Sequence, residues 1–165
     1  MDIYLDIETD FQRRITVVGF HSRATGFRQL VGREVTAEKL GASLPEKGRL
    51  FTFNGHCFDL PVIRTRLGLD LRARYQSVDL RYACARAGLA GGLKAVEGRL
   101  GIGRRLPGLD GLDAIRLWED YLARGAAGSL QILLAYNRED VMNLAKLKRR
   151  LCALGHVGAS SSGAT

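Results

Sequence analysis

Carboxylate side chains stand close together near the start of the chain. Asp6 and Glu8 lie two positions apart at the end of segment 2–7, where apolar and polar residues alternate as they do in a β-strand. Side chains at positions i and i+2 of a strand point to the same face, so the two carboxylates project together. Two neighbouring negative charges repel each other unless water or a cation screens them. The pair therefore has two interpretations, a divalent-cation site and a solvated strand end.

Two further acids occur where the same chemistry needs them. Asp59 follows the apolar segment 50–54 and begins an expected helix, so it is either a helix N-cap or a third carboxylate at the end of a strand. Asp140 lies four residues after Tyr136 in a long expected helix, which puts both side chains on one helix face. The alternative for this pair is a half-buried aromatic residue beside an exposed acid.

Four carboxylates are the ligand set of a hard cation. Mg²⁺ and Mn²⁺ prefer oxygen ligands over the sulfur of Cys and the nitrogen of His. The ordered set of acids thus favours a site for divalent cations.

The charge balance of the chain is consistent with a polyanionic partner. The sequence has 25 basic residues against 17 acidic ones, which gives a formal net charge of +8, and 20 of the basic residues are Arg. The planar guanidinium group of Arg matches phosphate oxygens in two-point contact. Nucleic acid is one interpretation of this excess, and a merely solvated basic surface is the other.

The elements that must position these residues follow from periodicity. The sequence predicts strands over residues 2–7, 14–21, 26–31 and 50–54. It predicts helices over residues 36–43, 59–68, 79–87, 93–100, 113–123 and from an N-cap at Ser129 to about Leu154. This order favours an α/β fold with a mixed β-sheet flanked by α-helices. We expect one domain over residues 1–155 and a disordered C-terminal tail over residues 156–165.

Several classes of protein do not fit the sequence. The motifs of P-loop NTPases, dinucleotide-binding enzymes, zincins and α/β-hydrolases are absent. The apolar runs fall far short of the ~20 residues that cross a bilayer, so no membrane partner is expected. Residues 1–10 carry four acids and no base, unlike a secretory signal. Three cysteines without a CxxC spacing indicate reduced thiols and predict a cytoplasmic location.

Together, the three motifs resemble a known family. DIETD at 6–10, NGHCFD at 54–59 and YNRED at 136–140 resemble the three motifs of the DEDD superfamily of 3′–5′ exonucleases, which have a ribonuclease H-like fold. Tyr136 four residues before the last acid is similar to the Tyr subgroup, DEDDy, which includes polymerase proofreading domains. Residues 91–121 further resemble small bacterial YprB-type ribonuclease H-like domains.

The resemblance implies a metal-dependent 3′–5′ exonuclease that releases nucleoside 5′-monophosphates from single-stranded or frayed 3′ ends. It makes Asp6, Glu8, Asp59 and Asp140 the ligands of two Mg²⁺ or Mn²⁺ ions, and Asp6 would bind both of them. It makes Tyr136 the residue that orients the attacking water. The residues expected to bind substrate are Ile7, Thr9, Asn54, Phe58 and Lys94.

Two other functions stay open at this stage. A catalytically weak or inactive module with this fold would bind nucleic acid and act with a helicase or a polymerase. A ribonuclease H or resolvase-type endonuclease shares the fold and the metal chemistry, but Tyr136 four residues before Asp140 argues against it.

Some neighbouring residues have more than one interpretation. Arg104 and Arg105 form either a substrate-binding loop or a solvated turn. Lys94 either reaches a phosphate or is a solvated helix residue. We expect Asp79 to cap its helix and Cys57 to be a small packing residue.

Overall fold

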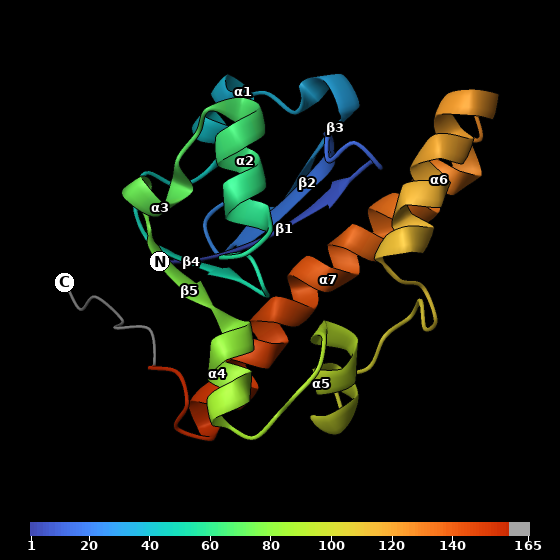
Figure 1. Cartoon of the computed structure of the whole chain (residues 1–165). Helices are drawn as coiled ribbons and strands as arrows, with labels where there is room; N and C mark the ends of the chain where they lie inside the picture. Colours follow the sequence, from blue (N-terminus) through green and yellow to red (C-terminus); the bar gives the residue numbers. More distant parts are fainter. Residues whose placement is uncertain (159–165) are drawn as a thin grey trace.

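A mixed five-stranded sheet forms the centre of the fold, with strand order β3-β2-β1-β4-β5 (Figure 1). Its strands are β1 (Asp2–Thr9), β2 (Ile15–Ser22), β3 (Gly26–Val31), β4 (Arg49–Thr52) and β5 (Gln76–Asp79). The first three strands are antiparallel neighbours, whereas β4 pairs parallel with β1 and β5 pairs parallel with β4. This sheet confirms the predicted α/β fold class.

The computed structural model describes residues 1–158, and helices cover both faces of the sheet (Figure 1). The helices are η1 (Gly32–Glu34), α1 (Ala37–Ser43), α2 (Asp59–Leu67), α3 (Leu71–Arg74), α4 (Leu80–Arg86), α5 (Leu93–Arg99), α6 (Gly111–Arg124) and α7 (Ala127–Ala153). Within residues 1–158, no helix combines the length and the apolar character needed to cross a membrane.

The central strand β1 is buried on both faces, which explains its composition. Ile3, Leu5 and Ile7 point to one side and join the core formed with α1, α2 and α3. Tyr4 points to the other side and packs in a second cluster with residues of α4, α5 and α7. Because side chains alternate along a strand, Asp6 and Glu8 continue the Tyr4 side and face α7. The alternation that directs the apolar side chains of β1 into the core therefore also directs Asp6 and Glu8 toward α7.

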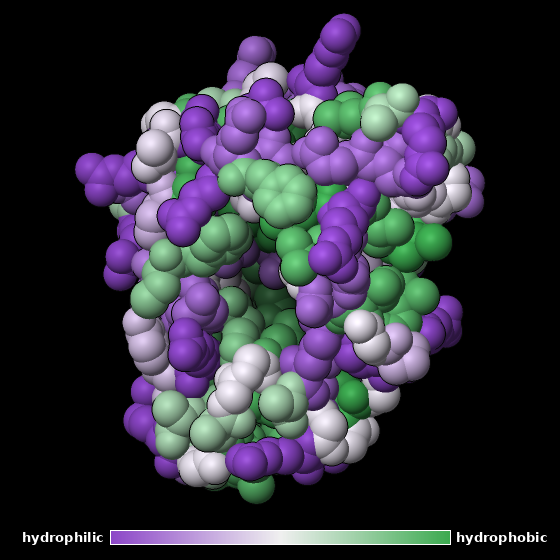
Figure 2. Space-filling view, turned by 45° about the vertical axis from the view of Figure 1, so that its right-hand side comes forward, coloured by the Kyte–Doolittle hydropathy of each residue, from purple (hydrophilic) through white to green (hydrophobic). Residues whose placement is uncertain are grey.

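A third cluster joins α6 and the N-terminal half of α7 to β2. Trp118 and Leu133 pack there against Val17, and Tyr136 of α7 belongs to the same cluster. An Asp110–Asp113 capping box begins α6. Hydrophilic side chains cover most of the face shown in Figure 2, and hydrophobic side chains line a hollow near its centre.

Three local predictions differ from the structure. The short strand β5 and helix α3 were not expected, because they lack the run of apolar residues that marks the equally short β4. Ser129 is not an N-cap, since α7 already begins at Ala127, with Ala126 before it and no side-chain cap. Of the predicted tail over residues 156–165, residues 159–165 lie outside the described residues, whereas the His156 N–H donates to the Leu151 carbonyl and Val157 packs against the second cluster.

Candidate functional site

Three carboxylates from two elements meet beside the central strand. Asp6 and Glu8 come from β1, and Asp140 comes from the middle of α7. One oxygen from each of these side chains lies within 4.8 Å of the other two. Glu8 and Asp140 are only 7% and 6% exposed. Residues separated by about 130 positions thus form one acidic cluster, as the sequence predicted.

The cluster is electrostatically strained without a cation. Burial raises the pKa of Asp6 well above its ordinary value, and the charges of Glu8 and Asp140 raise it further. The pKa of Glu8 is raised well above its usual range by burial and then by Asp140 and Asp59. Three converging oxygen donors without His or Cys suit Mg²⁺ or Mn²⁺, so the donor set fits a divalent metal.

Asp59 lies beside this cluster and is held by the backbone of β1. It is the first residue of α2, and Phe58 takes the N-cap position, so the alternative interpretation of Asp59 as an N-cap is wrong. Its Oδ1 accepts a hydrogen bond of 3.1 Å from the backbone N–H of Ile7. Burial raises the pKa of Asp59 to about 7, with further contributions from Asp79 and Asp140. The carboxylate is therefore near the other acids, although it lies outside the group of three that shares the 4.8 Å limit.

Asn137 positions Asp6 and was not identified from the sequence. Its Nδ2 donates to Asp6 Oδ2 at 3.0 Å and to the Asp6 carbonyl at 3.3 Å. Its Oδ1 accepts from Gln29 Nε2 at 2.9 Å. A Cβ atom at Gly19 would stand only 2.1 Å from that Oδ1, so β2 needs glycine where Asn137 approaches. The glycine within a strand of mostly β-branched and aromatic residues was the available signal.

Arg104 supplies a buried positive charge to the cluster. Its guanidinium pairs with Asp140, with Glu97 at 2.6 Å and with Glu139 at 3.4 Å, and the side chain is only 8% exposed. Both interpretations of Arg104 from the sequence, a substrate-binding loop and a solvated turn, are therefore wrong. Arg105 is exposed, as expected of a solvated turn, and its backbone N–H donates to Glu139.

Tyr136 and Lys94 face each other next to the acids. Lys94 Nζ donates to the Tyr136 hydroxyl at 2.7 Å and lies 4.6 Å from the centre of its ring. Burial and the charges of Asp140, Glu8 and Asp6 raise the pKa of Tyr136, so its hydroxyl stays protonated. Lys94 is thus directed at the site, and the interpretation as a solvated helix lysine is wrong.

The loop between β4 and α2 is fixed by Asp79. The Asp79 carboxylate accepts from the backbone N–H groups of Asn54 at 2.8 Å and His56 at 3.0 Å. It also accepts from Arg81 N–H, which confirms the predicted cap of α4. Asn54 has a positive φ of 61°. Cys57 is exposed, so its prediction as a packing residue is wrong.

The remaining predicted substrate-binding residues lie around these elements. The Ile7 side chain is buried on the α1–α3 side, away from the acids, and only its backbone N–H contacts Asp59. Thr9 is buried at the end of β1. Phe58 is partly buried against the core, with the Arg13 guanidinium 6.0 Å from its ring centre. The structure thus brings Phe58 and Asn54 to the loop before α2 but separates the Ile7 side chain from the site.

Comparisons with known proteins agree with this geometry. The model of the RNase H superfamily matches residues 3–152. Among solved structures, the family B DNA polymerase of the hyperthermophilic archaeon Pyrobaculum calidifontis superposes with a TM-score of 0.64 at 16% identity over 88% of this chain. The chain spans 24% of that polymerase. A search of curated protein sequences gives no significant match. The ribonuclease H-like fold is thereby confirmed, and the chain belongs to the RNase H superfamily.

Proposed function

We propose that this protein is a metal-dependent 3′–5′ exonuclease of the DEDDy type, which hydrolyses terminal phosphodiester bonds and releases nucleoside 5′-monophosphates. The observation that carries the proposal is the convergence of Asp6, Glu8 and Asp140 beside the protonated Tyr136 hydroxyl. The RNase H-like fold supplies the context of a nuclease. Nucleic acid is the substrate that this context and the net charge of +8 favour.

Asp6, Glu8 and Asp140 would hold divalent metal, and Asp59, on which the charge of Asp140 acts, would serve a second ion. When bound, Mg²⁺ or Mn²⁺ would lower the pKa of water, hold the phosphate and stabilise the leaving oxygen. Asn137 fixes the orientation of the Asp6 carboxylate through its hydrogen bond of 3.0 Å. The protein thus prepares the ligand oxygens before the substrate arrives.

The side chains around the metal ligands support the exonuclease proposal. A neutral tyrosine hydroxyl both donates and accepts hydrogen bonds, which allows Tyr136 to orient a water molecule. The Lys94 ammonium at 2.7 Å holds this hydroxyl and places a positive charge where an anionic phosphate would lie. Asn54 and Phe58, at the start of α2, would contact the terminal nucleotide.

A shortening assay tests the proposal. A 5′-labelled single-stranded DNA oligonucleotide with Mg²⁺ or Mn²⁺ should give a ladder that shortens from the 3′ end, and chelation should stop it. Asp6→Asn and Asp140→Asn should abolish shortening. Asp110→Asn is the matched control, because this acid caps α6 on the surface. Internal cuts in circular DNA, or unchanged cleavage by Asp140→Asn, would contradict the proposal.

One observation favours a second candidate, a catalytically weak or inactive nucleic-acid-binding module that acts with a helicase or polymerase. The Arg104 guanidinium engages Asp140 and thereby competes with a metal for that carboxylate. Salt-sensitive binding of DNA without any metal-dependent shortening would support this alternative.

A further inference from the structure

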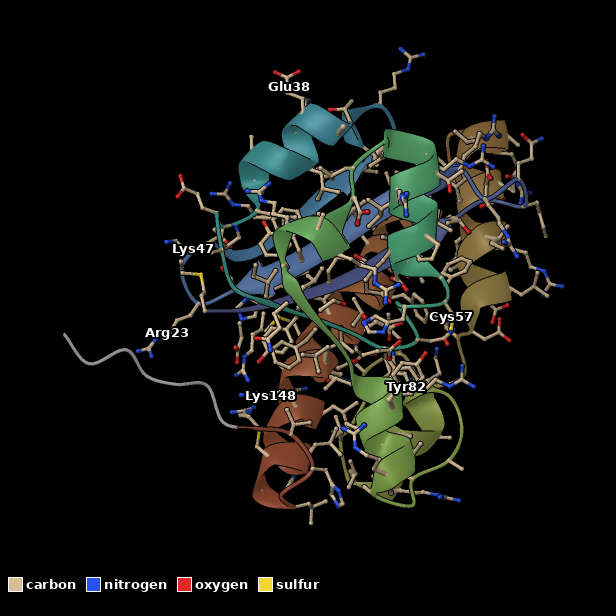
Figure 3. All side chains as sticks on the ribbon, turned by 60° about the vertical axis from the view of Figure 1, so that its left-hand side comes forward. Arg23, Glu38, Lys47, Cys57, Tyr82 and Lys148 are labelled. Atoms are coloured by element: carbon tan, nitrogen blue, oxygen red, sulfur yellow. The ribbon has the colours of Figure 1, made fainter. Side chains whose placement is uncertain are left out.

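An aromatic side chain is exposed next to the loop that leads into the carboxylate site. Tyr82 of α4 is 47% exposed. Its ring meets the ring of His56 edge to face, with centroids 5.7 Å apart and planes inclined by 63°. Its hydroxyl lies 3.8 Å from Sγ of Cys57, and the two labelled side chains are neighbours in Figure 3. A large ring thus contacts a neighbouring aromatic side chain, while about half of its residue's surface is open to solvent.

Hydrogen bonds hold helix α4, which carries Tyr82, to the loop before α2. Asp79 ties the loop to α4, because its carboxylate accepts from backbone groups of both. Arg81 Nη1 donates to Asn54 Oδ1 at 2.5 Å, and the His56 ring hydrogen-bonds the Ser77 hydroxyl at 2.7 Å. A Tyr side chain has only two torsion angles, so it loses little conformational entropy when a flat ligand stacks on it.

Tyr82 contacts a residue that is close in sequence to Asp59. Cys57, which contacts Tyr82, is two residues before Asp59, and two residues span at most about 7 Å. The Arg81 guanidinium, on the residue preceding Tyr82, supplies a positive charge beside the ring. An aromatic face next to a cation matches a base and its phosphate, and aromatic stacking accepts any base.

We propose that Tyr82, backed by His56, is a stacking platform for one unpaired base near the 3′ end, with Arg81 beside the adjoining phosphate. The inference rests on the proposed function and specifies its substrate as a strand whose last few bases are unpaired. A base in a duplex has both faces covered by its neighbours and cannot stack on Tyr82. The platform therefore favours single-stranded or frayed ends over blunt duplex ends.

A cycle of protein and substrate changes tests the platform. The substrates are single-stranded DNA 12-mers, one intact and three with an abasic site at position 2, 3 or 4 from the 3′ end. For each substrate, kcat/KM for release of the terminal nucleotide is measured in Mg²⁺. Tyr82→Ala should lower kcat/KM on the intact oligomer about 5- to 150-fold. The loss should disappear at one abasic position, and Tyr82→Phe should keep the wild-type rate within about twofold. Losses that persist at all three positions would overturn the platform.

A second measurement needs no catalysis. Oligomers with a disulfide-tethered base at the same positions are incubated with the protein in EDTA, and adducts at Cys57 are identified by mass. One position should react preferentially, Cys57→Ser should abolish that adduct, and Cys152→Ser should leave it. Position-independent labelling of Cys57, or none, would overturn the platform. A selective Cys57 adduct on a protein that never shortens DNA would refute the nuclease proposal and support base stacking.

Discussion

Replacement of Arg104 is the most informative perturbation of the site. The Arg104 side chain is 8% exposed and pairs with Glu97 and Asp140, which are themselves buried. Its pKa is raised because hydrogen bonds and charges of Asp140 and Glu97 outweigh its burial, so it stays charged. Arg104→Met keeps an unbranched apolar side chain but leaves two buried carboxylates without their cation. We expect the protein to lose stability and the cluster to bind metal more tightly.

The magnitude follows from the burial of the ion pairs. Removing one partner of a buried pair costs about 3–5 kcal/mol. In a chain of this size 1 kcal/mol corresponds to roughly 2–4 °C, so Tm should fall by about 6–20 °C. Added Mn²⁺ should recover more stability in Arg104→Met than in the wild type, because the freed Asp140 oxygen becomes available to the ion.

Differential scanning fluorimetry with and without Mn²⁺ measures both effects. Arg105→Met is the matched control, since this neighbouring side chain is exposed and should change Tm by less than about 2 °C. A change in Tm as small as that of the control would refute the buried ion-pair network. Weaker Mn²⁺ binding in Arg104→Met would refute competition and would mean that Arg104 orients Asp140 for the metal.

Three further outcomes follow from the geometry. The folded-state pKa of Asp59, about 7, exceeds its ordinary value, so the folded protein binds a proton more readily than the unfolded chain. The free energy of unfolding of the metal-free protein, measured by urea titration, should therefore rise as the pH falls from 8 to 5. Added Mg²⁺ should remove that gain. Gly19→Ala should lower the free energy of unfolding by about 1–3 kcal/mol, because the added methyl group overlaps Asn137. Gly98→Ala is the control, since open space surrounds this position and the protein should not be destabilised. Chemical denaturation compares the two variants, and equal midpoints would contradict the overlap. Lys94→Met should lower kcat about 100-fold without changing Tm, and an unchanged kcat would refute its role.

Regular alternation made the centre of the site predictable. The alternation along residues 2–7 gave both the core side of β1 and the side of Asp6 and Glu8, because the two are linked by strand geometry. The helical spacing of Tyr136 and Asp140 placed both on one face of α7, and the structure buries that face. These residues could be predicted because their partners lie within one element.

Residues whose role depends on another element could not be predicted. Arg104 belongs to a glycine-rich loop that is held by partners on other elements, namely Glu97, Asp140 and Glu139. Asn137 follows Tyr136 directly, and nothing in the neighbouring sequence reveals that its side chain reaches Asp6 of β1. Such side chains depend on contacts made at long range, which have no period in the sequence.

The convergence of distant carboxylates on divalent metal is tested most directly by calorimetric titration of the metal-free protein with Mn²⁺. The wild type should show saturable uptake, Asp140→Asn and Glu8→Gln should bind at least about 10-fold more weakly, and the surface variant Asp110→Asn should bind as the wild type does. Absence of uptake by the wild type, or equal affinity in all four proteins, would contradict a shared metal site of β1 and α7.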